Sequence, residues 1–114
     1  MDNFKRTYTL EDRIKESNRV LDYYPDRVPI ILDLQGDLLL IGRKTKYLIP
    51  DDITIAQFIF IFRKKIELTP EESIFIFINN TIPRTNEIMK NIYKTNKDED
   101  GFLYVQISKE NVFG

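Results

Sequence analysis

The sequence contains no cysteine and no histidine among its 114 residues. Cysteine nucleophiles, imidazole bases and the usual zinc sites are therefore excluded, and an enzyme would have to use carboxylates, Lys, Ser or Tyr alone. We accordingly expect no metal site, no cofactor and no enzymatic activity. The lack of cysteine also gives no sign of an oxidising compartment, so a cytoplasmic location is the default expectation.

The sequence also lacks an apolar run of membrane-spanning length, and its first residues, MDNFKR, lack the apolar stretch of a signal peptide. An excess of one charge is missing as well, because 17 Lys and Arg stand against 18 Asp and Glu. This balance argues against a general nucleic-acid binder, which is normally basic over a whole face. Hydrophobic residues at 42% and charged residues at 31% are instead typical of one soluble globular domain.

The first third of the chain predicts two helices. A short helical turn contains Phe4 and Tyr8, and a longer helix begins after Thr9, a capping residue, and ends at Pro25. One face of the longer helix carries apolar residues at helical spacing: Leu10, Ile14 and Leu21.

The next segments predict strands and a central helix. Residues 28–34 predict a strand, and Pro29 places its start at a sheet edge or at the first position of a strand. Residues 38–41 and 47–49 predict two further extended pieces, which is consistent with a hairpin. A capping pair, Thr54 and Gln57, together with a length of roughly twelve residues predicts a helix.

The last third predicts two further strands with a helix between them. Residues 69–72 predict one short helical start, with proline at its first position. Residues 74–78 are apolar throughout, which predicts a central strand covered on both faces. Thr85 is expected to cap a helix, and residues 102–107 predict the last strand. The apolar stripe of that helix consists of Ile88, Met89, Ile92 and Tyr93.

A hairpin, a helix and two more strands describe the β-grasp arrangement of ubiquitin. We therefore predict an α+β fold, a ubiquitin-like β-grasp with a four-stranded mixed sheet and two extra N-terminal helices. The expected division is an N-terminal helical extension (residues 1–24), a β-grasp core (residues 25–107) and a flexible C-terminal tail (residues 108–114).

The final glycine, Gly114, has two interpretations. The first is that glycine merely happens to be the last residue. The second is that its carboxylate is meant for activation, because a residue without Cβ can thread a narrow enzyme channel and leaves its carbonyl open to attack. A ubiquitin-like order of elements before it favours the second interpretation and makes residues 108–114 a conjugation tail.

The central helix has more apolar positions than one core face needs. A core stripe accounts for Ile55, Ile59, Phe62 and Ile66. We therefore expect Phe58 and Ile61 at the edge of the core or outside it, and exposed apolar residues rimmed by charge usually mark a docking site. Residues 47–50 would form the other wall of a groove that accepts an extended peptide by β-augmentation.

Basic residues flank this predicted groove at residues 43–46 and 63–65. They are either a solvated face or an attraction for acidic residues beside a partner's hydrophobic anchors. Nucleic-acid binding by the same residues is the weaker alternative. The acidic pairs at residues 51–52 and 71–72 are interpreted as helix caps rather than as general acid and base.

Several segments resemble the autophagy ubiquitin-like modifiers, a family that includes the GABA-receptor-associated protein and the microtubule-associated light chains. The resemblance runs in order over essentially the whole chain. The segments that carry it are YPDRVP (24–29), KYLIP (46–50), FIFINN (75–80), DEDGFLYV (98–105) and ENVFG (110–114).

This resemblance implies that Gly114 is passed through activating and conjugating enzymes to phosphatidylethanolamine. A deconjugating cysteine protease is a further implied partner. The lipidated form would lie on autophagosomal or related vesicle membranes, where it recruits cargo receptors and adaptors with an aromatic-x-x-aliphatic motif.

The resemblance also assigns peptide-binding residues. The aromatic pocket would consist of Glu16, Val20, Pro29, Ile31, Lys46, Leu48 and Phe102. The aliphatic pocket would consist of Tyr47, Ile49, Pro50, Ile53, Phe58 and Ile61. Arg27, Lys46 and Arg63 would meet acidic residues of the motif, and the backbone of residues 46–48 would pair with the peptide. Residues 74–76 resemble a second docking surface of the family.

Two other functions are open at this stage. A ubiquitin-fold docking domain without conjugation would only bind peptides, and the chemistry of the tail distinguishes it from a modifier. A small hydrolase would need a catalytic group of residues that the absence of Cys and His disfavours.

Overall fold

The computed structural model describes residues 3–36, 38 and 45–109 of the chain. Within these residues the elements follow the predicted order of two helices, two strands, a helix, a strand, a helix and a strand. Their bounds are α1 Asn3–Thr7, α2 Leu10–Tyr23, β1 Arg27–Leu34, β2 Lys46–Pro50, α3 Ile55–Lys65, β3 Ile74–Phe77, α4 Met89–Asn96 and β4 Leu103–Lys109. The predicted fold class, a four-stranded mixed sheet with two extra N-terminal helices, is confirmed.

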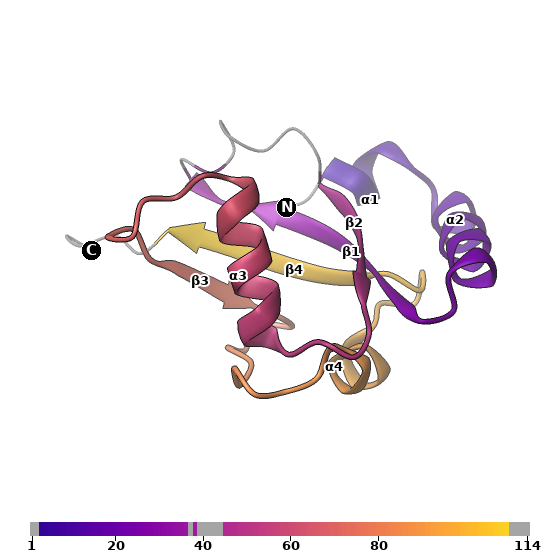
Figure 1. The fold of residues 1–114 in the computed structure, drawn as a ribbon. Coiled ribbons are helices and arrows are strands. Elements are labelled where there is room, and N and C mark those ends of the chain that lie inside the picture. Colours follow the sequence, from indigo (N-terminus) through magenta and orange to yellow (C-terminus); the bar gives the residue numbers. More distant parts are fainter. Residues whose placement is uncertain (1–2, 37, 39–44, 110–114) are drawn as a thin grey trace.

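The sheet has the strand order β2-β1-β4-β3 (Figure 1). β1 runs parallel to β4 and antiparallel to β2, and β3 is antiparallel to β4. The prediction that residues 74–78 form a central strand is therefore wrong, because β3 lies at an edge. Its apolar run divides between two faces: Ile76 is buried in the core, whereas Phe75 is exposed and packs against Phe77, with ring centroids 6.3 Å apart.

The strand that is central and covered on both faces is β1. The sheet-edge alternative for Pro29 is thus wrong, and Pro29 is the third residue of the strand. Its missing N–H costs no ladder bond because pairing with β4 begins one residue later, with Ile30 opposite Leu103.

One face of the sheet packs against α3, which lies across it (Figure 1). Alternate residues of the two central strands fill this core, since side chains alternate along a strand. They are Val28, Ile30, Leu32, Leu34, Leu103, Val105 and Ile107, joined by Ile55, Phe58 and Phe62 of α3. On the opposite face Ile31 and Phe102 are also buried, on the side where α2 packs on β1.

α2 begins as predicted, because the Thr9 side chain accepts a hydrogen bond from the backbone N–H of Asp12. Its apolar pattern did not reveal the buried face. Leu10 and Ile14 are exposed, and the buried residues of α2 are Arg13, Ser17 and Val20. The reason is a buried acidic partner for Arg13, described below.

α3 is also confirmed, with a capping box in which Thr54 and Gln57 satisfy each other's backbone N–H groups. The expected position of Phe58 is wrong, because it is a buried core residue. The apolar residue that projects outward is Phe60, which is 60% exposed with the Lys64 ammonium 4.5 Å from its ring centroid.

Two predicted helix starts are wrong. Residues 69–72 form a turn in which Glu72 bonds back to the backbone of Thr69, and no helix follows. Thr85 does not cap α4, which begins after Ile88 without a side-chain cap. The carbonyl of Thr85 instead accepts the N–H of Ala56, so this loop satisfies the first turn of α3.

Part of the predicted hairpin lies outside the described residues. Of residues 38–41 the structure describes only Leu38, which is buried in the core. Residues 43 and 44 of the basic stretch and residues 110–114 of the tail are outside as well.

Candidate functional site

The edge of β2 that faces away from β1 has a backbone without a strand partner among the described residues. Two backbone hydrogen bonds show which residues of this segment point towards β1. Leu32 N–H donates to Thr45 C=O at 2.8 Å, and Asp51 N–H donates to Asp26 C=O at 3.0 Å. Every second residue of β2 therefore bonds to β1, and those between them point outward. Lys46 and Leu48 present their N–H and C=O groups at this free edge.

Side chains of β2 alternate between the two faces of the sheet. Ile49 is buried in the core on the α3 side, and Tyr47 packs against the same core. Lys46 and Leu48 consequently lie on the other side, towards α2. The free backbone edge thus runs between two side-chain surfaces, one facing α2 and one facing α3.

A hollow of about 580 Å³ surrounds this edge. Most of the predicted peptide-binding residues line it: Glu16, Val20, Pro29, Lys46, Tyr47, Leu48, Ile49, Pro50, Ile61 and Phe102. Residues of α2, β1, β2 and α3 and the residue before β4 are thereby brought together, as a groove between α2 and α3 requires.

Five predicted residues do not line the hollow. Ile31 and Phe58 are buried, and Ile53 is half-buried against the core. Arg27 is exposed opposite Pro50 at the end of the β1–β2 ladder. The Arg63 guanidinium donates to the carbonyl of Thr69, 2.9 Å away, which directs it to the loop after α3.

Two residues of the hollow were missed by sequence reasoning: Arg19 and Tyr24. Helical spacing was the signal that pointed to Tyr24, because it follows Val20 by four positions and so lies on the same side of the helix as a predicted residue. Lys65, one of the basic residues predicted to flank the groove, also lines the hollow.

The charged residues that line the hollow are three cations, Arg19, Lys46 and Lys65, and one carboxylate, Glu16. Glu16 Oε1 lies 2.6 Å from Arg19 Nη2 and 3.3 Å from Lys46 Nζ. The hydrogen bond from Arg19 lowers the pKa of Glu16, against a smaller opposing effect of burial, and Lys46 adds to the lowering. Glu16 is therefore ionised at neutral pH, and the remaining positive charge favours an acidic ligand.

The wall formed by α2 is attached to the β-grasp core through a buried ion pair. Arg13 Nε donates to Asp100 Oδ2 at 2.9 Å, and both side chains are buried. The same guanidinium donates to the backbone carbonyl of Tyr8 at 2.8 Å, and Ser17 Oγ donates to the carbonyl of Asp100 at 2.6 Å. A buried pair with these additional bonds holds both N-terminal helices in place.

The same carboxylate positions the aromatic floor of the hollow. Asp100 Oδ1 accepts the backbone N–H of Phe102 at 2.8 Å, and Asp100 Oδ2 also accepts the Tyr104 hydroxyl. The ring of Phe102 is fully buried and meets the ring of Phe4 edge-on, with centroids 5.1 Å apart. Gly101, at φ +90°, provides the turn between these residues.

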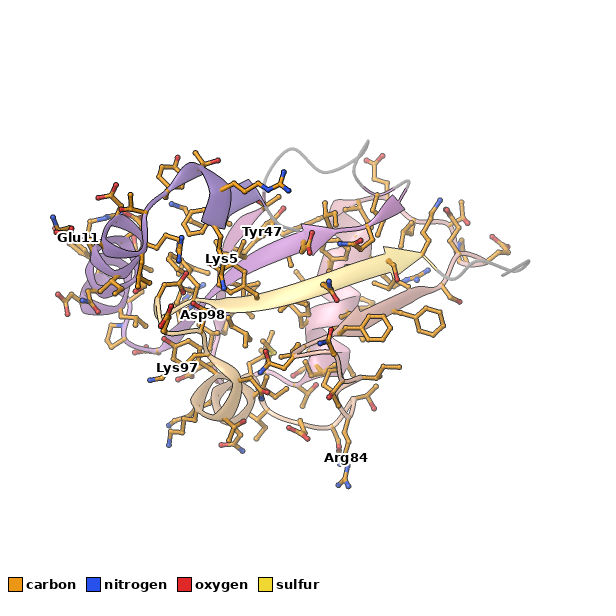
Figure 2. The ribbon with its side chains drawn as sticks, turned by 180° about the vertical axis from the view of Figure 1, so that it is seen from behind. Lys5, Glu11, Tyr47, Arg84, Lys97 and Asp98 are labelled. Atoms are coloured by element: carbon orange, nitrogen blue, oxygen red, sulfur yellow. The ribbon has the colours of Figure 1, made fainter. Side chains whose placement is uncertain are left out.

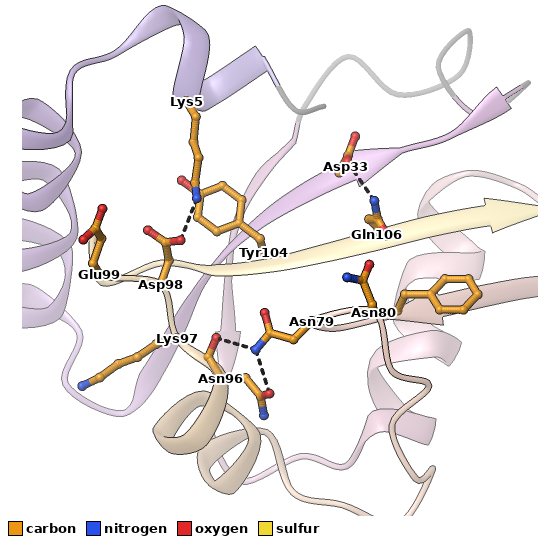
Figure 3. Close-up of a pocket in the computed structure, with 11 residues that line it drawn as sticks. Lys5, Asp33, Asn79, Asn80, Asn96, Lys97, Asp98, Glu99, Tyr104 and Gln106 are labelled. Carbon is orange, nitrogen blue, oxygen red and sulfur yellow. Dashed lines mark hydrogen bonds and ion pairs between the residues drawn. The ribbon is translucent and has the colours of Figure 1, made fainter.

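A second hollow, of about 520 Å³, lies on the face of the sheet opposite α3 (Figures 2 and 3). Several of its polar side chains pair with one another. Lys5 Nζ lies 2.6 Å from Asp98 Oδ1, and Asn79 Nδ2 lies 3.0 Å from Asn96 Oδ1. Burial alone raises the pKa of Asp98, but the Lys5 ammonium and the backbone N–H of Asp100 outweigh it and lower that pKa. These groups stabilise the junction of α1, β4 and α4 rather than offering free ligands.

An ion pair lies at the C-terminal end of β4, next to the predicted tail. Lys109, the last residue of β4, places Nζ 2.5 Å from Glu72 Oε2. This ammonium lowers the pKa of Glu72 to about 2 from 4.5, with help from the backbone N–H of Thr69. Gly114 itself lies outside the described residues, so its role stays a prediction.

Residues 3–36, 38 and 45–109 contain neither a candidate metal site nor a candidate membrane-spanning helix. No cluster of three acidic side chains there is placed to hold a metal ion. No helix in the same residues combines the length and the apolarity needed to cross a membrane.

Known proteins match this chain over nearly its whole length. Residues 12–114 match the family model described as autophagy protein Atg8 ubiquitin like. Autophagy-related protein 8B of Oryza sativa subsp. indica is 49% identical over 114 residues, covering 98% of this chain and 95% of the relative.

Solved structures agree in fold. The crystal structure of Trypanosoma brucei ATG8 has a TM-score of 0.89 and 36% identity, covering 100% of this chain and 99% of that one. Plasmodium falciparum Atg8, solved in complex with a Plasmodium falciparum Atg3 peptide, has a TM-score of 0.84 and 30% identity, covering 96% and 100%.

Proposed function

Because the chain belongs to the Atg8 ubiquitin-like family of autophagy proteins, we propose that it is a modifier joined through Gly114 to phosphatidylethanolamine. Activating and conjugating enzymes would form this bond, and a deconjugating cysteine protease would remove it. The lipidated protein acts on autophagosomal or related membranes, where its groove recruits receptors with an aromatic-x-x-aliphatic motif.

The observation that carries the recruiting function is the free edge of β2 inside the groove. An extended segment can add to this edge by bonding to the outward backbone groups of Lys46 and Leu48. Its alternate side chains then fall on the two sides of β2, one between α2 and β2 and one between β2 and α3. The fully buried ring of Phe102 supports the first of these positions, and Ile61 flanks the second.

The charge of the groove also favours a peptide of this kind. Lys46 and Arg19 share the single carboxylate of Glu16, so one positive charge remains here to attract acidic residues next to the aromatic anchor. Peptide binding by a relative agrees with this, since Plasmodium falciparum Atg8 was solved with a peptide of Atg3.

Conjugation is tested by incubating the purified protein with the activating and conjugating enzymes, ATP and liposomes containing phosphatidylethanolamine. We expect a lipid adduct for the wild-type chain and none for Gly114→Ala, detected by mass spectrometry. An adduct that forms equally with Gly114→Ala would exclude attachment at this residue. A wild-type chain that forms no adduct but binds peptides would identify a docking domain without conjugation.

The groove is tested with a peptide that has a Trp-x-x-Leu core and upstream acidic residues. We expect micromolar binding, about −8 kcal/mol, by isothermal titration calorimetry. Leu48→Ala should weaken binding without unfolding, because Leu48 is only half-buried. Phe60→Ala is the matched control, since Phe60 is apolar and exposed but outside the hollow. Equal affinities of wild type and Leu48→Ala would place the peptide elsewhere.

A further inference from the structure

The C-terminal end of α2 presents two adjacent aromatic rings to solvent. Tyr23 is 73% exposed and Tyr24 is 52% exposed. Their centroids are 6.4 Å apart and their planes are inclined at 44°, so the two rings form an open angle rather than a flat stack. Contiguous exposed apolar surface of this kind usually marks an interaction site. We refer to these two residues as the tyrosine pair.

The tyrosine pair continues the wall of the groove. Glu16, Val20 and Tyr24 follow one another at intervals of four residues, and all three line the hollow. The backbone fixes the end of this row, because the N–H of Tyr24 donates to the carbonyl of Val20 at 2.8 Å and its own carbonyl accepts the N–H of Arg27 at 3.1 Å. A segment lying in the groove can therefore reach the ring of Tyr24, and the ring of Tyr23 lies beside it, with centroids 6.4 Å apart.

Arg19, the basic residue one turn before the tyrosine pair, already has an acidic partner. Arg19, one turn before Tyr23, donates from Nε and Nη2 to the two oxygens of Glu16, at 3.2 and 2.6 Å. Glu16 in turn raises the pKa of Arg19. Beside this ion pair the two exposed tyrosine rings offer apolar, aromatic surface, which suits an aromatic occupant.

We propose that the tyrosine pair is an accessory subsite for one aromatic side chain of the bound segment, outside the aromatic-x-x-aliphatic core. This proposal rests on the proposed function, because the core must first occupy the groove. Aromatic rings favour offset or edge-to-face contacts, and two inclined rings provide one face and one edge for a third ring. Such a contact strengthens binding by about two- to tenfold.

The test compares the core peptide with derivatives in which phenylalanine replaces alanine at each flanking position in turn. Calorimetry with the wild-type protein should show a two- to tenfold lower Kd at one flank only. In Tyr23→Ala this gain should disappear while the affinity for the core peptide is unchanged. Tyr23→Phe keeps the ring and should keep the gain, and so should the control Phe60→Ala, which removes an exposed aromatic ring from α3.

Three results would overturn the subsite: no flanking phenylalanine improves binding, the gain survives in Tyr23→Ala, or arginine at the same position gives a larger gain than phenylalanine. The last result would mean that the rings bind a cation. Failure of the core peptide to bind the wild-type protein would instead refute the proposed groove.

Discussion

Replacement of Asp100 by alanine tests the attachment of the N-terminal helices to the core. Asp100 is fully buried, and it bonds to the Arg13 guanidinium, the Phe102 N–H and the Tyr104 hydroxyl. Its loss leaves a buried cation without its charge partner, which costs about 3–5 kcal/mol. The lower value applies because Arg13 keeps its bonds to the carbonyls of Tyr8 and Lys5. At about 4 °C per kcal/mol, the melting temperature should fall by about 12 °C.

The assay is urea and thermal denaturation followed by far-ultraviolet circular dichroism, because the chain has no tryptophan to serve as a fluorescence probe. Glu11→Ala is the matched control on the same helix. It breaks the ion pair of Glu11 with Lys15, which has both side chains exposed and a separation of 3.5 Å. That pair contributes about 0.5 kcal/mol or less.

The reasoning is refuted if Asp100→Ala is destabilised by no more than Glu11→Ala. The double variant Arg13→Leu with Asp100→Leu gives a second check. It removes both charges, so its loss of stability should be smaller than the sum of the losses in the two single variants.

Three further predictions concern stability and ionisation. Gly101→Ala should cost about 1–3 kcal/mol in denaturation experiments, because φ is +90° and a Cβ would lie 2.4 Å from a side-chain oxygen of α2, whereas Gly36→Ala, with φ +57° and open space, should cost less. A Glu72 pKa of about 2 means that its stabilising effect is complete above pH 4.5 and is lost as the pH falls through 2; NMR titration should show this midpoint, and Lys109→Gln should raise it. Thr54→Ala should destabilise by about 1 kcal/mol through loss of the capping box, measured by urea denaturation, and an unchanged midpoint would show that the cap is dispensable.

Local signals in the sequence predicted most of the elements. The caps at Thr9 and Thr54 act within three residues, so their meaning is readable without knowledge of the fold. The errors arose where the partner is distant in sequence. Arg13 is buried because it pairs with Asp100 in the loop before β4, and the spacing of residues within α2 contains no signal for this distant carboxylate.

The same distinction applies to strand position and helix phase. The apolar run of β3 suggested two covered faces, but its edge position depends on the pairing of β4 with β1. In α3 the run of apolar residues left the helix phase open, and packing buried Phe58 while exposing Phe60. Side-chain composition alone does not fix which of several equivalent apolar positions faces the core.

The groove was predictable in outline and less so in detail. A short strand followed by a helix with more apolar positions than one core face needs indicated a docking surface. The family resemblance supplied the residues of that surface. Which backbone groups of β2 point outward depends on its register with β1, and that is set by long-range pairing. Ile31 and Phe58 do not line the hollow because both are buried, Phe58 in the core under α3 and Ile31 on the opposite face of the sheet.

The central position of β4 has a consequence for how the protein is made. β4 is the last of the described strands to leave the ribosome, yet it fills the gap between β1 and β3. Until it is synthesised, both neighbours expose unpaired edges, which are templates for association with other chains. Pairing of β1 with β4 also closes most of the length of the chain into a loop, and contacts so distant in sequence form slowly. A nascent chain therefore holds an incomplete sheet until β4 has left the ribosome, and during that interval the exposed edges of β1 and β3 are prone to association with other chains.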